Sequence, residues 1–366
     1  MRYLFLSLLM VLQSSSFAVE KSDSLQQILN KVVDNKKVFG ATFAIKYQDS
    51  IWHGESGNIK SDQPFFIAST TKLFVTSIIL KLRSEGKLSL NDKISKYLDS
   101  SVMKDLHIYK GKDYSYDITI QHLLAQTSGL PDYFEDKNKE GVSLELQLFE
   151  GKDRSWTFLD ALAISKTLPT HFIPGTAKKA HYSDTNFQLL GKIIEAIYGK
   201  SFNEVVEEII FNPLAMKSTY IYKDSKDTTP LPLYYKSEKL MIPLAMSSFV
   251  ADGGAVSTTT DMLIFIEAFF TGKLFPVSYI EELKQWNKIF FPLQSGVGIH
   301  RFKLPWFFDP AGMTPELIGH SGLSGAMAYY SEKDKLFIVG TVNQVAYPST
   351  SFNTAVKLIM KVRGKK

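Results

Sequence analysis

A serine and a lysine three positions apart carry the clearest potential for chemistry in this sequence. Ser69 and Lys72 follow a short apolar approach and precede residues 73–82, whose apolar positions spread almost all round a helical wheel. This pattern is typical of a buried helix, and side chains three positions apart share one helix face. A serine becomes nucleophilic when a base lies within about 2.6–3.2 Å, and a lysine amine can be that base. The spacing therefore indicates a serine nucleophile with a lysine base.

The same four-residue pattern occurs twice more, so the match alone does not decide the question. Ser84 stands at a helix end before Gly86, and Ser101 has no long apolar helix after it, so we interpret both matches as chance. Taken alone, Ser69 is equally compatible with a nucleophile and with an ordinary serine cap of a helix.

Two further stretches carry side chains that could join the serine. Tyr182 and Asp184 lie where a loop enters a predicted helix, residues 186–198. Tyr182 could move protons or simply pack, and Asp184 could act as a carboxylate or cap the helix. His320 and Gly322 lie in a glycine-rich stretch that runs into a predicted strand, where glycines let a ligand approach the backbone closely.

Composition excludes several other kinds of function. The chain has 366 residues, 45% hydrophobic and 22% charged, which predicts a sizeable folded core. The absence of cysteine excludes disulfides, thiolate nucleophiles and cysteine-based zinc sites. The seven histidines show no spacing typical of metal ligands, so we predict no metal site and no cofactor, and we interpret His171 and His181 as structural. A mild net charge of +5 predicts no nucleic-acid partner.

The first residues have the pattern of a secretory signal peptide. Arg2 precedes an apolar run over residues 4–12, and small residues follow at Ser16 and Ala18. The run is too short to span a bilayer as a membrane helix. We predict cleavage after Ala18, a secreted or periplasmic location and no stable membrane span afterwards. The alternative is that the segment stays uncleaved as an N-terminal anchor.

Strands at both ends of the chain and helices between them predict an α+β fold. The predicted elements are a helix over 24–38, strands over 41–47 and 51–57, helices over 202–210 and 262–270, strands over 296–299, 326–330 and 336–342, and a final helix over 350–362.

We predict one domain after the signal peptide. Residues 1–18 would be the signal, and residues 19–366 would form the domain. Its sheet-containing part would come from residues 19–84 and 255–366, with a mostly helical part over residues 85–254 inserted between them.

Three motifs stand in order along the chain: Ser69 to Lys72, Tyr182 to Asp184, and His320 to Gly322. With supporting stretches at 120–131, 172–175, 186–191 and 253–258, the sequence resembles the serine β-lactamase-like family. The nearest branch holds class C β-lactamases, D-alanyl-D-alanine carboxypeptidases and related esterases. The resemblance covers roughly the whole mature chain. It implies a β-lactamase/transpeptidase-like fold, with an antiparallel sheet flanked by helices and a helical inserted subdomain.

The resemblance also implies an acyl-enzyme mechanism. Ser69 would attack a carbonyl, Lys72 and Tyr182 would act together as the base, and Tyr182 would protonate the leaving group. The backbone amides of Ser69 and Leu323 would hold the oxyanion. His320 would orient the substrate or the tyrosine.

Two positions depart from the pattern of this family branch. Asp184 replaces the usual asparagine, which places a carboxylate near Lys72. The carboxylate could hold Lys72 protonated, or share the hydrogen-bonding role of the asparagine. His320 replaces the lysine of class C β-lactamases, which favours carboxypeptidase, esterase or amidase chemistry over β-lactam hydrolysis. Asp184 and Gly322 complete the predicted substrate-binding and oxyanion set.

These inferences lead to one main functional prediction and two alternatives. The main prediction is a secreted serine hydrolase of the D-alanyl-D-alanine carboxypeptidase type, or a related amidase or esterase. Its partner would be a small peptide, amide or ester, including a peptidoglycan stem peptide or a β-lactam. The alternatives are a class C-like β-lactamase and a non-catalytic envelope-binding protein on the same fold. Residues 133–154 and 241–249 are predicted to line the substrate cleft.

Overall fold

A computed structural model describes residues 22–60, 62–310 and 312–364 of the chain. The predicted signal peptide, residues 1–18, lies outside the described residues. Within the described ranges, every helix is too short or too polar to cross a membrane.

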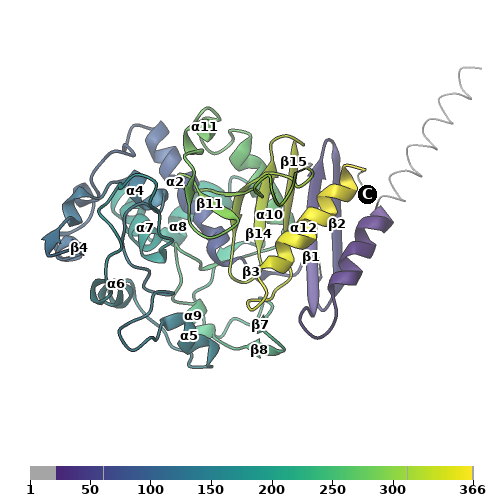
Figure 1. Cartoon of the computed structure of the whole chain (residues 1–366), viewed down its shortest axis with the longest axis horizontal. Coiled ribbons are helices and arrows are strands. Elements are labelled where there is room, and N and C mark those ends of the chain that lie inside the picture. Colours follow the sequence, from purple (N-terminus) through teal and green to yellow (C-terminus); the bar gives the residue numbers. More distant parts are fainter. Residues whose placement is uncertain (1–21, 61, 311, 365–366) are drawn as a thin grey trace, which may run out of the picture.

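Eight antiparallel strands from the two ends of the chain form the main sheet (Figure 1). In spatial order the strands are β10 (Asn287–Lys288), β11 (Leu293–Ser295), β12 (His300–Phe302), β13 (Leu317–Ser321), β14 (Met327–Ser331), β15 (Leu336–Thr341), β1 (Gly40–Tyr47) and β2 (Ser50–Gly57). Thr42 of β1 lies opposite Thr341 of β15, so the first strand of the chain pairs with the last. The sheet is therefore assembled across almost the full length of the sequence, as predicted.

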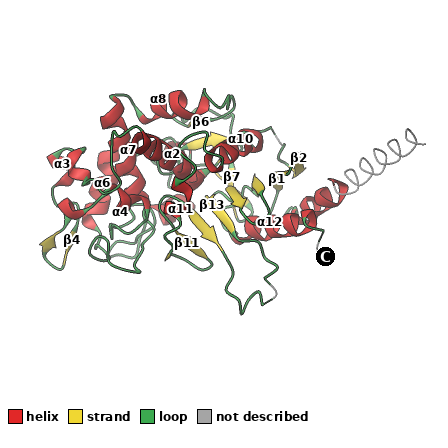
Figure 2. Cartoon of the chain, turned by 90° about the horizontal axis from the view of Figure 1, so that it is seen from above, coloured by secondary structure: helices red, strands yellow, loops and turns green. Residues whose placement is uncertain are grey.

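Side chains alternate between the two faces of this sheet, and each face is covered by helices (Figure 2). Phe43 of β1 packs in one core with the helix over residues 22–32 and with α12 (Ser349–Val362). Ala44, the next residue, packs in the other core with α2 (Lys72–Ser84) and α10 (Thr259–Phe270). The helix predicted to be buried is α2, and ten of its thirteen residues are buried.

The remaining helices form a largely helical part beside the sheet. They are α3 (Ser100–Met103), α4 (Ile120–Leu124), α5 (Leu144–Phe149), α6 (Phe158–Thr167), α7 (Asp184–Tyr198), α8 (Phe202–Val206), α9 (Pro243–Met246) and α11 (Tyr279–Leu283). Four single turns accompany them: the 3₁₀ turns Ala68–Thr71, Ile94–Lys96 and Ser115–Asp117, and the π turn Glu207–Phe211. Helix α7 packs against both α2 and α4. Packing α7 on α2 brings together the parts of the chain that carry the first two motifs.

A small three-stranded sheet supports the approach to Ser69. Its strands are β3 (Phe65–Phe66), β9 (Ala255–Ser257) and β6 (Tyr220–Ile221), with β9 in the middle. The Ile67 amide donates to the Ala255 carbonyl at 3.0 Å, which continues this pairing up to the 3₁₀ turn. Two two-stranded sheets lie elsewhere: β4 (Ile108–Tyr109) with β5 (Lys112–Asp113), and β7 (Leu233–Tyr235) with β8 (Glu238–Leu240).

The prediction of a strand over residues 296–299 is wrong, because these residues form the turn between β11 and β12. Gly298 has φ +73°, and its amide donates to the Leu124 carbonyl at 2.9 Å. A Cβ atom on Gly298 would lie 2.4 Å from Thr76 Oγ1 on α2. A glycine is therefore needed at position 298, because the turn is left-handed and packs closely on α2. The alternation of glycine with Val297 and Ile299 resembles the pattern of a strand, which explains the wrong prediction.

Candidate active site

Ser69 lies in the 3₁₀ turn Ala68–Thr71, directly before α2. Ala68 has φ +46°, a left-handed conformation that is uncommon for a residue other than glycine. The Ser69 Oγ lies 2.9 Å from Lys72 Nζ and 2.7 Å from the Tyr182 hydroxyl. The structure therefore brings the three predicted catalytic side chains into direct contact, while their catalytic roles remain predictions.

Lys72 is fully buried and its Nζ contacts three oxygen atoms. Besides Ser69 Oγ, these are the Asp252 carbonyl oxygen at 2.5 Å and Asp184 Oδ1 at 2.6 Å. The contact with Asp184 is close, but its angles are not those of a hydrogen bond, so it is an electrostatic contact. A lysine amine 2.9 Å from Ser69 Oγ lies within the distance at which a general base can accept the serine proton.

Asp184 is the first residue of α7 and adjoins three other carboxyl groups. Burial and the negative charge of Asp184 raise the pKa of Asp252 to about 6, and the pKa of Asp132 well above its usual range. The surrounding protein and Asp184 likewise raise the pKa of Glu135 to about 8. The N-terminus of α7 stabilises a charge on Asp184. Of these carboxyl groups, Asp184 is the one whose side chain contacts Lys72 Nζ directly, at 2.6 Å.

Tyr182 enters the site from the residue pair just before α7. Burial and the nearby charge of Asp184 raise the pKa of Tyr182 well above the usual value for a phenol. Tyr182 therefore keeps its proton at neutral pH and donates it in the hydrogen bond to Ser69 Oγ. A protonated phenol beside the nucleophile suits proton transfer to a leaving group.

Replacement of Asp184 by asparagine is expected to move the acidic limb of the pH–rate profile to lower pH, because it removes a negative charge that contacts Lys72 Nζ. The carboxylate 2.6 Å from Lys72 Nζ favours the ammonium, which cannot accept the Ser69 proton, and an amide keeps an acceptor oxygen without the charge. The measurement is kcat/KM against pH with a p-nitrophenyl ester. Asp160→Asn, which changes a carboxylate in the first turn of α6, is the control. An acidic limb that stays in place in Asp184→Asn contradicts this account.

The third motif places two histidines, not one, near the site. His320 lies on β13 and stacks on His300 of β12, with ring centroids 3.9 Å apart, and the ring of Tyr182 lies 5.9 Å from that of His300. Burial lowers the pKa of His300 to about 3 and the pKa of His320 well below its usual value, so both rings are neutral at neutral pH. His300 lines the cleft, and His320 is not among the lining residues. His300, rather than His320, therefore occupies the position from which a histidine can contact the substrate or Tyr182. His300 was not identified from the sequence.

Gly322 lets the end of β13 approach the nucleophile turn. A Cβ atom on Gly322 would lie 2.4 Å from the Ile67 carbonyl oxygen and 3.1 Å from the Ser69 amide nitrogen. Leu323, the next residue, lines the cleft together with Ser69. The backbones of Ser69 and Leu323 thus lie close together, as an oxyanion site formed by their amides requires. That role remains a prediction.

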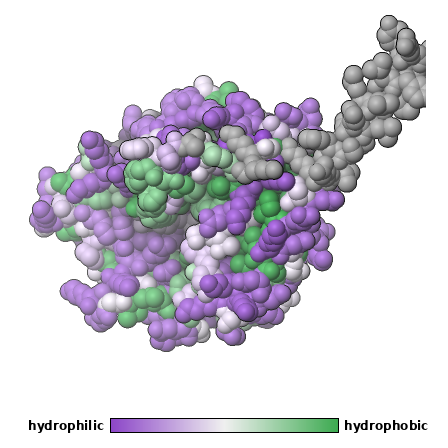
Figure 3. Space-filling view, turned by 45° about the vertical axis from the view of Figure 1, so that its right-hand side comes forward, coloured by the Kyte–Doolittle hydropathy of each residue, from purple (hydrophilic) through white to green (hydrophobic). Residues whose placement is uncertain are grey.

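Two hollows meet at Ser69. The larger one has a volume of about 780 Å³ and is lined by Tyr182, His300 and exposed aromatic side chains such as Phe291. Figure 3 shows the wider context, in which apolar side chains gather in patches on an otherwise hydrophilic face.

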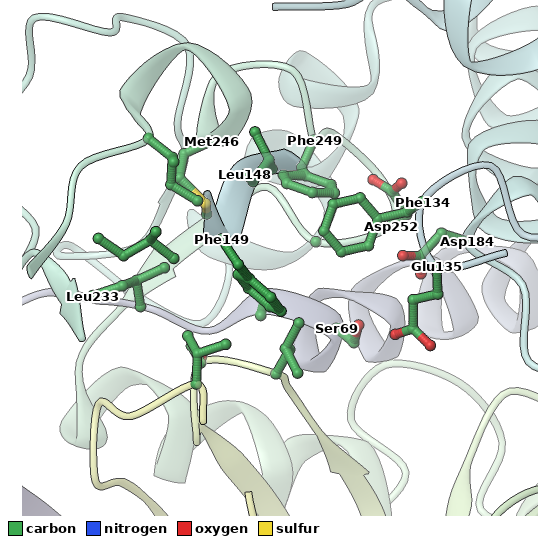
Figure 4. A pocket seen from close by; sticks show the side chains of 17 residues that line it. Ser69, Phe134, Glu135, Leu148, Phe149, Asp184, Leu233, Met246, Phe249 and Asp252 are labelled. Carbon is green, nitrogen blue, oxygen red and sulfur yellow. The ribbon is translucent and has the colours of Figure 1, made fainter. Parts of the chain in front are cut away.

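The smaller hollow is apolar and has a volume of about 60 Å³. Its apolar lining consists of Ala68, Phe134, Leu148, Phe149, Leu233, Leu240, Ile242, Met246, Phe249, Leu323 and Val345. In Figure 4, Ser69, Glu135 and Asp184 lie at one end of this hollow, and Leu233 and Met246 lie at the other. The prediction that residues 133–154 and 241–249 line the cleft is confirmed.

Glu135 belongs to the segment 133–154 that was predicted to line the cleft, although the sequence did not single it out as a site residue. Its side chain lines both hollows beside Ser69. The surrounding protein disfavours its charge, yet water reaches the carboxyl group through the open cleft. Glu135 can therefore exchange its proton and meet a bound substrate.

Comparison with known proteins gives matches along most of the chain. The family model described as Beta-lactamase matches residues 25–358. A protein of Escherichia coli (strain K12), provisionally named a D-alanyl-D-alanine carboxypeptidase, is 31% identical over 185 residues, which are 50% of this chain and 39% of that protein. A Salmonella paratyphi A protein with the same name is 34% identical over 191 residues, or 51% and 41% of the two chains. This chain thus spans about two fifths of the length of the curated relatives it matches.

Solved structures show the same fold. A D-stereospecific amidohydrolase from Streptomyces sp. superposes with a TM-score of 0.75 at 26% identity, covering 91% of this chain and 98% of that one. A D-amino acid amidase from Ochrobactrum anthropi SV3, complexed with L-phenylalanine amide, gives a TM-score of 0.77 at 21% identity, covering 94% and 99%. These matches confirm the predicted fold class.

Proposed function

Because this chain belongs to the beta-lactamase family and is a serine hydrolase of that family, we propose that it cleaves amides or peptides of D-amino acids through an acyl-enzyme on Ser69. The observation that carries the proposal is the contact of Ser69 Oγ with both Lys72 Nζ and the Tyr182 hydroxyl where two hollows meet. The relatives named as a D-alanyl-D-alanine carboxypeptidase and as a D-stereospecific amidohydrolase support the substrate class. The pattern of residues 1–18 supports export of the protein before it acts.

The contacts in the site suggest an order of proton transfers. Lys72 accepts the Ser69 proton as Oγ bonds to the substrate carbonyl carbon, and the amides of Ser69 and Leu323 stabilise the oxyanion. Tyr182 donates its proton to the leaving nitrogen and is reprotonated from Lys72. Water then attacks the carbonyl carbon of the acyl ester. Lys72 and Tyr182 take a proton from this water and pass it to Ser69 Oγ as the ester bond breaks.

The charges along the cleft favour an amidase over a carboxypeptidase or a β-lactamase. Recognition of a free substrate carboxylate is served best by a cation near the nucleophile. His300 is neutral, and Lys357 of α12 is the one lysine or arginine among the described lining residues of the two hollows. Beside Ser69 stands Glu135 instead, a carboxyl group that pairs with an ammonium. The substrate is therefore expected to carry a free amino group rather than a free carboxylate at this point.

The apolar hollow supplies a second anchor for the substrate. Its volume of about 60 Å³ accommodates a short aliphatic side chain, and burial of such a group contributes about 0.8 kcal/mol per CH₂. With the carbonyl at Ser69, the amino group at Glu135 and the side chain in the hollow, three points of contact fix the substrate. Three fixed points allow discrimination between mirror-image substrates.

Glu135→Gln is expected to raise KM about 10- to 100-fold for a D-amino acid amide with a free amino group, with little change in kcat. The variant keeps the size of the side chain but cannot pair its charge with an ammonium. An N-acetylated substrate should respond to the same change much less. The measurement is KM and kcat for D-alanine p-nitroanilide and its N-acetyl form. Glu150→Gln, an exposed change in the same segment, serves as the control.

The wild-type enzyme should bind the free-amino substrate best near pH 8. The pKa of Glu135 is raised to about 8, and that of an α-amino group is about 7.7–8.0. At lower pH both groups are protonated, and at higher pH both are deprotonated, so the attractive pair is lost in either direction. The N-acetyl substrate should lack this maximum.

Three results separate the alternatives. Equal KM values for free and acetylated substrates would remove the role of Glu135 but leave the serine hydrolase intact. Equal turnover of L-isomers would remove the D-amino acid preference. Efficient hydrolysis of nitrocefin with weak hydrolysis of the amides would favour the class C-like β-lactamase.

A further inference from the structure

A second cluster of potential ligands lies outside the cleft, where three segments of the helical part meet. Asp136 Oδ2 lies 2.8 Å from His171 Nε2 and 3.0 Å from His181 Nε2. The two imidazole rings are stacked, with centroids 3.5 Å apart and planes inclined by 26°. The ligand atoms of all three side chains lie within 4.8 Å of one another. Two imidazole nitrogens and a carboxylate oxygen thus converge on one point.

The backbone holds this cluster in place. The His171 amide donates to the Gly129 carbonyl at 2.9 Å, and the His181 amide donates to the Gln126 carbonyl at 2.9 Å. Asp136 Oδ2 also accepts from the Asp132 amide at 2.9 Å. The backbones of His171 and His181 and the side chain of Asp136 are therefore tied to the single segment 126–132. Ligands held in this way lose little conformational freedom when they bind an ion.

We propose that Asp136, His171 and His181 bind a divalent transition-metal ion such as Zn²⁺, with water completing the coordination. Two imidazoles and one carboxylate suit Zn²⁺ and its neighbours, whereas Ca²⁺ and Mg²⁺ prefer oxygen ligands. The ion would bond to both Nε2 atoms and to the Asp136 carboxylate. Each imidazole that binds the ion through Nε2 would carry a proton on Nδ1 only. The sequence-based expectation of no metal site rested only on short spacings, and these ligands are 35 and 10 residues apart.

Some charges around the cluster favour the binding of a cation and others oppose it. Burial raises the pKa of Asp136, but hydrogen bonds from His171 and His181 outweigh it and hold the pKa well below its usual range, so the carboxylate is ionised. A hollow of about 340 Å³ gives both histidines access to solvent. Its other lining residues include three lysines, at positions 178, 179 and 288, whose charges oppose a cation. The affinity is therefore expected to increase when these lysines are neutralised.

The cluster adjoins the catalytic cleft along the chain. His181 precedes Tyr182, and Asp136 follows Glu135. An ion bound to His181 and Asp136 would restrict the motion of the backbone next to Tyr182 and Glu135. The ion would thus stabilise the position of these two cleft residues without contacting the substrate.

The test is titration of the full chain with Zn²⁺ after removal of metals by a chelator, followed by calorimetry at pH 7.5. We expect saturable binding of one ion by the wild type. His171→Ala should weaken it by about 100-fold or more, because even the loss of a residue that only supports a ligand costs 10- to 100-fold. His171 is exposed, so this variant is expected to fold. His53→Ala, which changes a histidine on β2, should bind as the wild type does.

A second measurement keeps the result independent of calorimetry. Zn²⁺ should raise the melting temperature of the wild type and of His53→Ala but not that of His171→Ala. Lys178→Gln combined with Lys179→Gln should tighten binding. The proposal is overturned if the wild type shows no saturable binding, or if both His171→Ala and His181→Ala bind Zn²⁺ as tightly as the wild type. It is also overturned if inorganic phosphate, but not Zn²⁺, stabilises the protein, because the hollow would then be an anion site.

Discussion

Ser69→Ala is expected to lower kcat for every substrate by about a million-fold, because the acyl-enzyme cannot form without its hydroxyl. The variant should fold normally, since it removes one partly exposed oxygen at the junction of two hollows. Hydrolysis of a D-amino acid amide and covalent labelling by a fluorophosphonate measure the loss. Both signals should disappear together.

The sequence itself supplies the matched controls. Ser84 and Ser101 begin the two other matches to the same four-residue pattern, and neither lines the two hollows of the cleft. Ser84→Ala and Ser101→Ala should therefore keep full activity and full labelling. If Ser69→Ala retained the biological role of the protein while losing hydrolysis, the non-catalytic envelope-binding alternative would be favoured instead.

Tyr182→Phe is expected to lower kcat for amides by about 100- to 10,000-fold, the range for loss of a general acid or base. The same change should affect p-nitrophenyl esters far less. An amine must be protonated before it leaves, whereas p-nitrophenolate leaves without a proton. The hydroxyl that donates to Ser69 Oγ at 2.7 Å is the group placed to supply that proton.

The readout for Tyr182→Phe is the ratio of amide to ester turnover, measured over one range of pH. Tyr330→Phe on β14, outside the cleft lining, should leave this ratio unchanged. A proportional fall in both rates would show that Tyr182 takes part in the attack on the carbonyl, or in its geometry, rather than in leaving-group protonation.

The contact of Ser69 with Lys72 and Tyr182 could be predicted because the signals along the chain are local and ordered. Ser69 and Lys72 share a helix turn, and Tyr182 stands at the start of a strongly periodic helix. The hairpin β14–β15 and helix α12 could be predicted for the same reason, since alternation and helical periodicity are properties of short windows.

Other cleft residues could not be predicted, because long-range packing alone decides their position. His300 belongs to no motif, and it joins the site only because β12 pairs with β13 next to His320. The sequence predicted that residues 133–154 line the cleft, but only the tertiary fold decides that the Glu135 side chain is one of those that enter it. The wrong strand over residues 296–299 has a similar cause, since the contact of Gly298 with Thr76 joins distant parts of the chain.

The pairing of β1 with β15 has a consequence for biogenesis. Phe43 lies opposite Gly340, so nearly 300 residues must be made before the central ladder of the sheet can close. Until then β1 has only β2 beside it, and its other edge can pair with foreign strands. A ribosome-bound or prematurely terminated chain that ends before residue 336 should therefore be prone to aggregation and dependent on chaperones. Strand β15 (Leu336–Thr341) thus completes the central ladder of the sheet long after β1 (Gly40–Tyr47) has been made.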